Sequence, residues 1–156
     1  MDATSESTTV ERELVIDARP ETVWELLTDE SEHARWMGQV AQLDLRPGGA
    51  YRVEVIPGNT ASGEFVEIDP PRRLVYTWGW ETGGSASVVP PGSSTIEFEL
   101  VPTGAGTLLR FKHTDLPSTE SAGSHGHGWD HYFARLASAA AGGDPGVDPW
   151  ISGAME

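Results

Sequence analysis

The stretch HGHGWDHYFARLASAA, residues 125–140, decides the fold, because its apolar side chains recur with the period of an α-helix. Four of them are spaced by four, three and four residues and therefore share one face: Trp129, Phe133, Leu136 and Ala140. The pattern predicts an amphipathic C-terminal helix over residues 118–141, ended by the two glycines that follow. Such a helix needs an apolar surface to cover.

That surface is predicted upstream, where the pattern changes to strands. Residues 10–17 alternate between apolar and acidic side chains, which is typical of a half-buried strand. Six further strands are predicted, separated by turn sequences rich in Pro and Gly: 39–45, 50–56, 62–69, 73–80, 94–100 and 107–114. Short connections between successive strands favour an antiparallel meander, and the alternation gives the sheet one apolar face.

Two short helices are predicted between the first strand and the meander. Over residues 18–29, Pro20 suits a first helical turn, and apolar side chains follow at helical spacing. Residues 31–38 are predicted as a second helix with Ser31 as its N-cap. The whole is an α+β helix-grip fold, in which a curved antiparallel sheet of seven strands wraps around a long C-terminal helix. We expect a polar N-terminal tail at 1–9, one domain at 10–141, and a C-terminal tail at 142–156 that Trp150 could anchor.

Composition narrows the classes of function. Ten Lys and Arg residues against 24 Asp and Glu residues leave a formal net charge of -14, which repels nucleic acid and anionic membrane surfaces. The absence of cysteine excludes disulfides and thiolate chemistry. The polar, acidic start of the chain is unlike a signal peptide, and no apolar run has the length of a membrane span. We therefore expect a cytoplasmic protein with neither nucleic acid nor a membrane as a partner.

The chain resembles a known superfamily along residues 10–141. The resemblance rests on segments that occur together and in order: RELVIDARPETVWELLTD, ARWMG, DLRPGGAYRVEV, GEFVEIDPPRRLVYTWGW, VPPGSSTIEFEL, GTLLRFKHTDLP and HGHGWDHYFARL. They are similar to the SRPBCC superfamily, also called START-like or birch-pollen-allergen-like. The branch they resemble is named after the C-terminal domain of the activator of the heat shock protein 90 ATPase. This fold hosts many unrelated functions, so the resemblance implies fold more strongly than activity.

The resemblance implies a cavity between the sheet and the last helix, suited to a small apolar or amphipathic ligand. We expect its lining to come from aromatic residues and a few polar ones: Trp36, Tyr51, Glu64, Tyr76, Trp78, Trp80, Phe98, Phe111, His113, His125, Trp129 and Phe133. The aromatic members could equally be plain core, since the two roles overlap in this fold. Trp36 and the Gly-rich loop 81–92 are candidates for the rim and lid.

Two polar members of this set have two interpretations each. Glu64 shares a strand face with Val66 and Ile68, so it points inward if those two do, unless a bulge shifts the register. The alternative is a position near the strand end, in water. His125 lies four residues before Trp129 on the apolar stripe. It could be a polar group of the cavity wall, or a histidine that is hydrogen-bonded to backbone or water.

The histidines at the start of the same helix do not predict a metal site. His127 and His131 are four residues apart and could share a helix face, with His125, His113 or Asp130 as a third ligand. The intervening glycines weaken the helix there, and no complete metal-binding pattern is present. We therefore expect no metal and no cofactor.

Three classes of function remain open. The first is a binding module for a small apolar or amphipathic molecule. The second is a cyclase- or hydrolase-like enzyme, which would need an acid/base pair such as His113 or His125 with Glu64, and no catalytic residue can be assigned from the sequence. The third is a chaperone-interacting protein, as the name of the branch suggests. A homodimer would be favoured if the outer face of the sheet were apolar.

Overall fold

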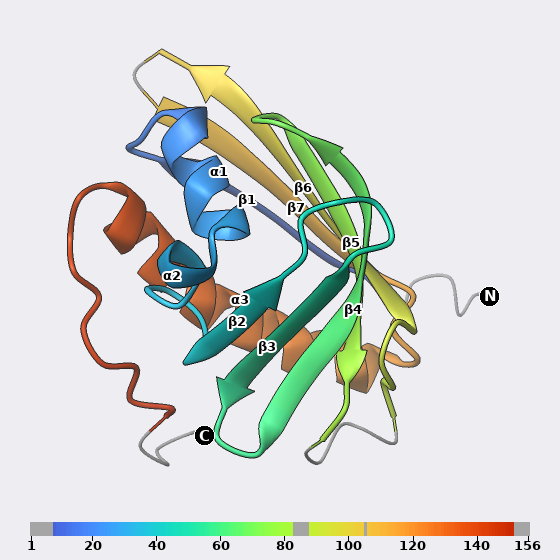
Figure 1. The fold of residues 1–156 in the computed structure, drawn as a ribbon. Coiled ribbons are helices and arrows are strands. Elements are labelled where there is room, and N and C mark those ends of the chain that lie inside the picture. Colours follow the sequence, from blue (N-terminus) through green and yellow to red (C-terminus); the bar gives the residue numbers. More distant parts are fainter. Residues whose placement is uncertain (1–7, 83–87, 105, 152–156) are drawn as a thin grey trace.

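A seven-stranded antiparallel sheet curves around one long helix in the computed structural model, which describes residues 8–82, 88–104 and 106–151 (Figure 1). The strands are β1 (Val10–Ile16), β2 (Val40–Leu43), β3 (Ala50–Ile56), β4 (Asn59–Asp69), β5 (Arg73–Trp80), β6 (Ser94–Thr103) and β7 (Gly106–Thr114). The helices are α1 (Pro20–Thr28), α2 (Glu30–His33) and α3 (Thr119–Ala140). This arrangement confirms the predicted α+β helix-grip fold.

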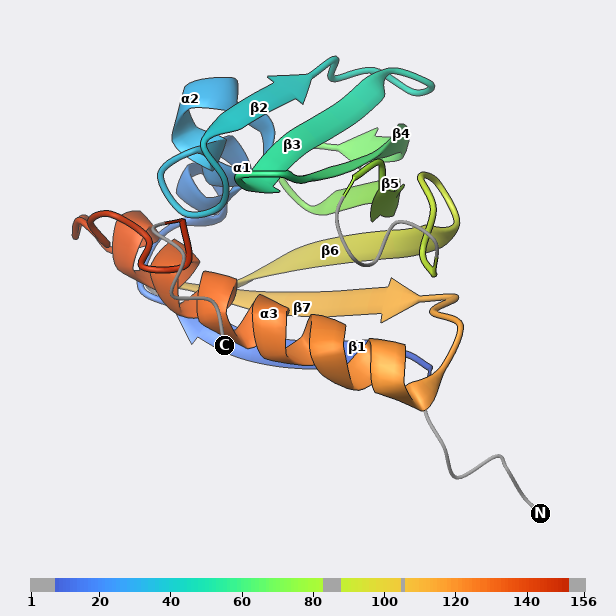
Figure 2. The same cartoon turned by 90° about the horizontal axis from the view of Figure 1, so that it is seen from below.

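The sheet has the strand order β1-β7-β6-β5-β4-β3-β2, with every neighbouring pair antiparallel. Strands β2 to β7 form a meander, and the chain crosses from β1 at one edge to β2 at the other through α1 and α2. Figure 2 shows the sheet bending around α3, which runs along the side of β7 and β1. None of the helices among the described residues is long and apolar enough to span a membrane.

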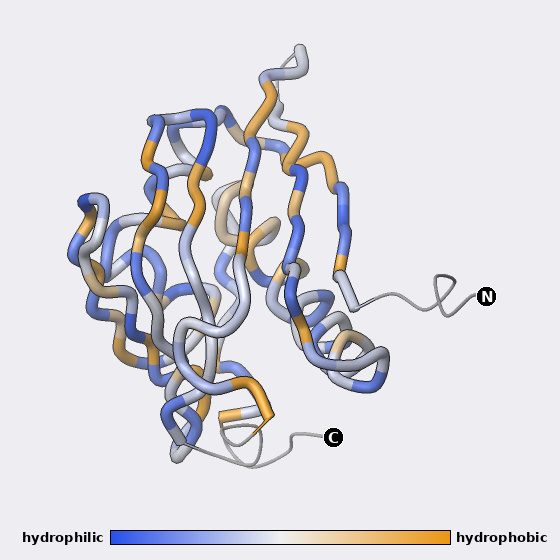
Figure 3. Tube along the Cα trace, turned by 90° about the vertical axis from the view of Figure 1, so that its right-hand side faces the viewer, coloured by the Kyte–Doolittle hydropathy of each residue, from blue (hydrophilic) through white to orange (hydrophobic). Residues whose placement is uncertain are grey.

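The alternation of side chains assigns the two faces of the sheet, as predicted. Along the strands in Figure 3, short hydrophobic and hydrophilic segments follow one another. In β6, Ile96, Phe98 and Leu100 are buried, while the residues between them are more exposed. The apolar side chains therefore meet α3, and charged side chains occupy the outer face.

Aromatic side chains from successive strands fill the space under α3. Tyr51 of β3 stacks on Tyr76 of β5 with ring centroids 4.2 Å apart, and Phe98 and Phe111 continue the row across β6 and β7. Phe111 contacts both Trp129 and Phe133 of α3, each at 4.8 Å between ring centroids. The interior between sheet and helix is thus mostly packed side chains.

The start of α2 differs from the prediction. Its N-cap is Asp29 rather than Ser31, because the Asp29 carboxylate accepts hydrogen bonds from the backbone N–H groups of Ser31 and Glu32. The Ser31 hydroxyl also bonds to this carboxylate, and together these donors lower the Asp29 pKa. The helix is one turn long and does not extend to the predicted end at residue 38.

Some predictions concern residues whose structure is not described. The N-terminal tail at 1–9 is described only at residues 8 and 9, and residues 152–156 of the C-terminal tail lie outside the description. The loop 81–92, a candidate lid, includes residues 83–87, which also lie outside it. The candidate functional site is therefore built from the other segments.

We predict that Trp129→Ala strongly destabilises the protein. Trp129 is 3 % exposed and its ring stacks on Phe133 at 5.5 Å, so truncation removes a large buried surface and leaves a cavity. The expected loss is about 3–5 kcal/mol of unfolding free energy, seen as a melting temperature lower by about 10 °C. Val147→Ala, at a position that is 84 % exposed, is the control and should leave the melting temperature unchanged. A Trp129→Ala protein that melts within about 2 °C of the parent would contradict this account.

Candidate functional site

A small pocket of about 100 Å³ opens between the sheet and α3. It lies where the β3–β4 hairpin and the end of β5 face the middle of α3, and the C-terminal tail forms one side. Its lining residues are Met37, Val55, Ile56, Asn59, Trp78, Trp80, Ser124, His125, Gly128, Trp129, Tyr132 and Trp150.

Local periodicity explains how distant segments contribute to this pocket. Trp78 and Trp80 are two residues apart on β5, so both point to the helix side of the sheet. On α3, His125, Gly128 and Tyr132 are spaced by three and four residues, so they lie on one face of the helix. The pocket forms where these two faces meet without filling the space between them.

The pocket is walled by rings and has no charged side chain. Five of its residues are Trp or Tyr, and none of the lining residues is Asp, Glu, Lys or Arg. The indole N–H of Trp78 is buried and has no hydrogen-bond partner among the described residues. The Tyr132 hydroxyl is also buried and lies beside the Asp148 carboxylate, and burial and then this carboxylate raise the pKa of Tyr132. An apolar lining with a few polar groups is the usual chemistry of a small-molecule site.

His125 is a lining residue whose two ring nitrogens both have partners. Its Nδ1 lies 2.9 Å from the Ser121 carbonyl oxygen, and its Nε2 accepts a hydrogen bond of 3.1 Å from the indole N–H of Trp80. These bonds require the neutral tautomer with the proton on Nδ1. His125 therefore lies on the wall of this pocket and is also hydrogen-bonded to backbone, so its position combines the two interpretations from the sequence.

His113 lies behind the pocket in a second hydrogen-bonded group. Its Nδ1 accepts a bond of 3.1 Å from the indole N–H of Trp129, and its Nε2 lies 2.8 Å from the Ser94 hydroxyl. The Ser94 hydroxyl donates its proton to the Trp78 carbonyl oxygen, so Nε2 of His113 must be the donor to Ser94. This direction is opposite to that of a serine nucleophile activated by histidine, and Ser94 is buried.

A third buried histidine, His33, supports the first part of the core. Its Nδ1 lies 3.2 Å from the Met37 carbonyl oxygen and its Nε2 3.2 Å from the Tyr51 hydroxyl. Because the carbonyl can only accept, Nδ1 carries the proton and the Tyr51 hydroxyl donates to Nε2. His33 thus satisfies a phenol in the same way that His113 and His125 satisfy indoles.

Burial keeps these histidines neutral. Desolvation lowers the pKa of His33 to about 4. Desolvation, and then the neighbouring His125, lowers the pKa of His113 to about 3. Desolvation also lowers the pKa of His125, partly opposed by its bond to Ser121. None of the three is therefore a ready proton acceptor near neutral pH.

The structure separates the expected lining residues into three groups. Trp78, Trp80, His125 and Trp129 line the pocket. A second group is buried core away from it: Trp36, Tyr51, Tyr76, Phe98, Phe111, His113 and Phe133. Trp36, a candidate for the rim, is fully buried and donates its indole N–H to the Leu26 carbonyl oxygen.

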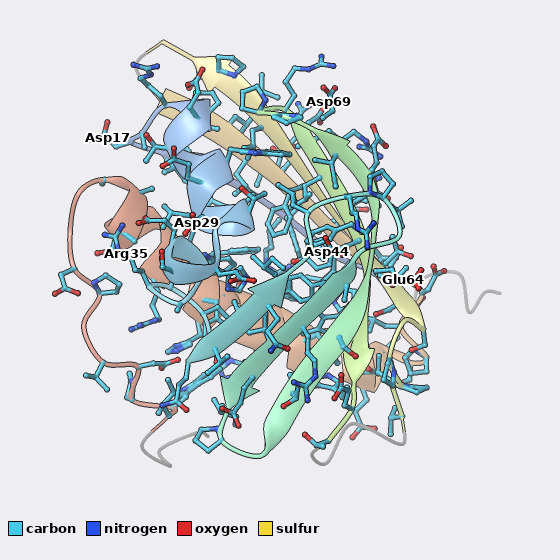
Figure 4. All side chains as sticks on the ribbon, viewed as in Figure 1. Asp17, Asp29, Arg35, Asp44, Glu64 and Asp69 are labelled. Carbon is cyan, nitrogen blue, oxygen red and sulfur yellow. The ribbon has the colours of Figure 1, made fainter. Side chains whose placement is uncertain are left out.

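The remaining residue, Glu64, points outward, so the inward interpretation is wrong and the alternative of a position in water holds. A bulge shifts the register between Phe65 and Glu67, so Phe65 and Ile68 share the inner face, whereas Glu64 and the exposed Val66 lie outside it. Glu64 is exposed, and Figure 4 shows it beside β4 on the side of the sheet away from α1 and α2. It cannot form the acid/base pair with His113 or His125 that an enzyme of the predicted kind would need.

Several lining residues were not predicted from the sequence. Gly128 and Tyr132 each lie one residue before a member of the main apolar stripe on α3, so a pattern search for core residues passes over them. Trp150 was expected only to anchor the tail, which it does by stacking on His131 with ring centroids 3.7 Å apart. Among the described residues, no group of three or more His, Cys, Asp or Glu side chains could hold a metal ion.

A larger groove of about 470 Å³ lies on the outer face of the sheet, but its character is different. Most of its lining side chains are charged, and several form ion pairs across the strands. Arg110 pairs with Glu13 and Arg73 with Glu97, each with a nitrogen–oxygen distance of 3.1 Å. The lining of this groove is therefore not the apolar surface on which the expectation of a homodimer depended. It also offers little to an apolar ligand.

We predict that stability falls as the pH drops from about 6.5 toward 4. In this range an unfolded histidine is protonated while buried His33 and His113 stay neutral, so the unfolded state binds more protons. The stability that each neutral histidine contributes is fully present above the pKa of histidine in the unfolded chain. It is lost as the pH falls below that pKa, at about 1.4 kcal/mol of unfolding free energy per pH unit for each histidine. Urea unfolding at pH 7, 6 and 5 measures the free energy of unfolding at each pH. His113→Gln should reduce the slope of this free energy against pH by about 1.4 kcal/mol per pH unit. An identical slope in the variant would show that His113 is not held neutral.

Comparisons with known proteins agree with the fold. The family of Activator of Hsp90 ATPase homolog 1-like proteins matches residues 17–141. No curated protein gives a significant match. Among solved structures, an AHSA1-like protein from Rhizobium etli is 43% identical, with a TM-score of 0.72, over 95% of this chain and 91% of its own.

Two further structures extend the comparison. CalU16 from Micromonospora echinospora is 31% identical over 95% of this chain and 73% of its own, with a TM-score of 0.75. The Aha1 dimer from Colwellia psychrerythraea is 17% identical over 85% of this chain and 96% of its own, with a TM-score of 0.72, and supports the fold alone. With the helix-grip fold and a family match over most of the domain, the chain belongs to the family of Activator of Hsp90 ATPase homolog 1-like proteins.

Proposed function

We propose that the protein binds a small, uncharged, apolar or amphipathic molecule in the pocket between β3–β5 and α3. The observation that carries the proposal is the lining, which combines four Trp rings and one Tyr ring with no charged side chain. Burying a charged ligand group there without a partner would be costly, whereas an apolar ring gains contact with the indoles.

The size of the pocket limits what it can enclose. About 100 Å³ is well below the roughly 300–1,000 Å³ of sites that enclose a drug-sized ligand. A ring or a short chain fits inside, and the rest of a larger amphipathic ligand would lie at the mouth. The buried indole N–H of Trp78 could donate to an acceptor on the enclosed part.

An enzymatic role has less support. Glu64 is on the opposite face of the sheet, and both nitrogens of His113 and His125 already have partners. The chaperone-interacting role rests on the family's name. A stoichiometric complex between this protein and the Hsp90 of its own organism would favour that role over the one proposed.

Gly128 provides a direct test of ligand binding. A Cβ built at Gly128, which lines the pocket, meets no atom within 4 Å, so a larger side chain can grow into open space. We predict that Gly128→Leu weakens binding of N-phenyl-1-naphthylamine, an uncharged apolar dye, by about tenfold or more, a loss of about 1.4 kcal/mol. Dye fluorescence measures the affinity.

Gly123→Leu is the matched control. Gly123 is on the same helix, is exposed, also has open space at its Cβ and is not part of the lining. Both substitutions replace a helical glycine and should raise helix stability by a similar amount, so a difference between them reports on the pocket alone. Equal dye affinity in the two variants would contradict the proposed site.

A further inference from the structure

The C-terminal tail completes the pocket, although it lies beyond the part of the chain that matches the family. The match ends at residue 141, whereas Trp150 is one of the lining residues. In Figures 1 and 2 the red tail leaves the end of α3 and turns back along that helix toward the β2–β3 side of the sheet. One wall of the pocket is therefore supplied by a segment outside the matched domain.

A few discrete contacts hold this segment on α3. The carboxylate of Asp148, which is 2 % exposed, accepts hydrogen bonds from His131 Nε2 at 2.8 Å and from the Trp150 backbone N–H at 3.0 Å. The Trp150 ring lies flat on His131 and meets Tyr132 edge to face at 5.6 Å. Asp148 thus fixes the backbone that presents Trp150 to the pocket.

A second anchor fixes the first half of the segment. The Arg135 guanidinium donates to the carbonyl oxygens of Pro145 and Gly146, at 3.3 and 2.9 Å, and to that of Trp36 at 3.1 Å. One side chain of α3 therefore ties the tail to the segment after α2.

Apart from these contacts, the tail has features that are typical of segments that unfold locally. It contains no helix or strand, and most of residues 142–147 are exposed, with Val147 at 84 %. Gly142 and Gly146 adopt positive φ values, so the chain turns where backbone freedom is greatest.

We propose that residues 142–151 form a strap whose docking closes the pocket, and that the strap must lift for a ligand to enter or leave. Trp150 is the part of the strap that covers the ligand, and the Asp148–His131 contact is the latch. This inference rests on the proposed function, because it concerns access to the same pocket.

The test is the rate at which N-phenyl-1-naphthylamine enters and leaves the full-length protein, followed by stopped-flow fluorescence. Asp148→Ala removes the latch and keeps the Trp150 ring, so both association and dissociation should become about tenfold faster with a small change in affinity. Trp150→Ala removes the cover and should also speed dissociation. Val147→Ala, in the exposed part of the strap, is the control and should leave the rates unchanged. Melting temperatures of all variants verify that each remains folded.

The outcomes separate the two proposals. If the rates of Asp148→Ala and Trp150→Ala equal those of the parent while Gly128→Leu still weakens dye binding, the strap is a passive tail and only the present inference is wrong. If the dye binds neither the parent nor the Trp150→Ala variant, the proposed function fails and the strap inference with it.

Discussion

One helix has to cover the concave face of a seven-stranded sheet, and the rest of the structure follows from how that space is filled. The space between the sheet and α3 is bridged by large aromatic side chains. A row of rings runs from β3 to β7 and meets Trp129 and Phe133 on α3. Among the described residues, a small pocket remains beside this packing at the β3–β4 end. The pocket lies where the rings of β5 and α3 border the space under the helix without filling it.

Filling a core with Trp and Tyr brings polar atoms into the interior, and the buried histidines provide their partners. His113 and His125 accept from the indoles of Trp129 and Trp80, and His33 accepts from the Tyr51 hydroxyl. Neutral imidazole suits this purpose because one nitrogen accepts while the other donates to a backbone or hydroxyl oxygen. Histidines that look like catalytic candidates in the sequence are thus occupied in holding the aromatic core together. The indole of Trp78, beside the pocket, has no such partner within the part of the chain that the structure describes.

The pocket combines a family domain with a segment that lies beyond it. The sheet and α3 supply the indoles and the open space above Gly128, and the tail adds Trp150 through contacts with His131 and Arg135. In the proposed binding site, the tail can therefore alter the shape of the pocket and the access to it without a change in the core. The unrelated charged groove on the outer face shows that the two faces of the sheet present different chemistry.

The sequence by itself determined the order of elements, the inner face of most strands, the apolar stripe of α3 and the family, because period and turn residues are local signals. It did not determine which aromatic residues fill the core and which border the pocket, since that depends on side chains meeting from segments far apart in the chain. One extra residue in β4 was enough to turn Glu64 outward, because side chains in a strand alternate and a bulge reverses every face beyond it. Likewise, no local pattern in residues 142–151 could show that Trp150 lies against His131, because only the turn of the tail back along α3 brings the two rings together.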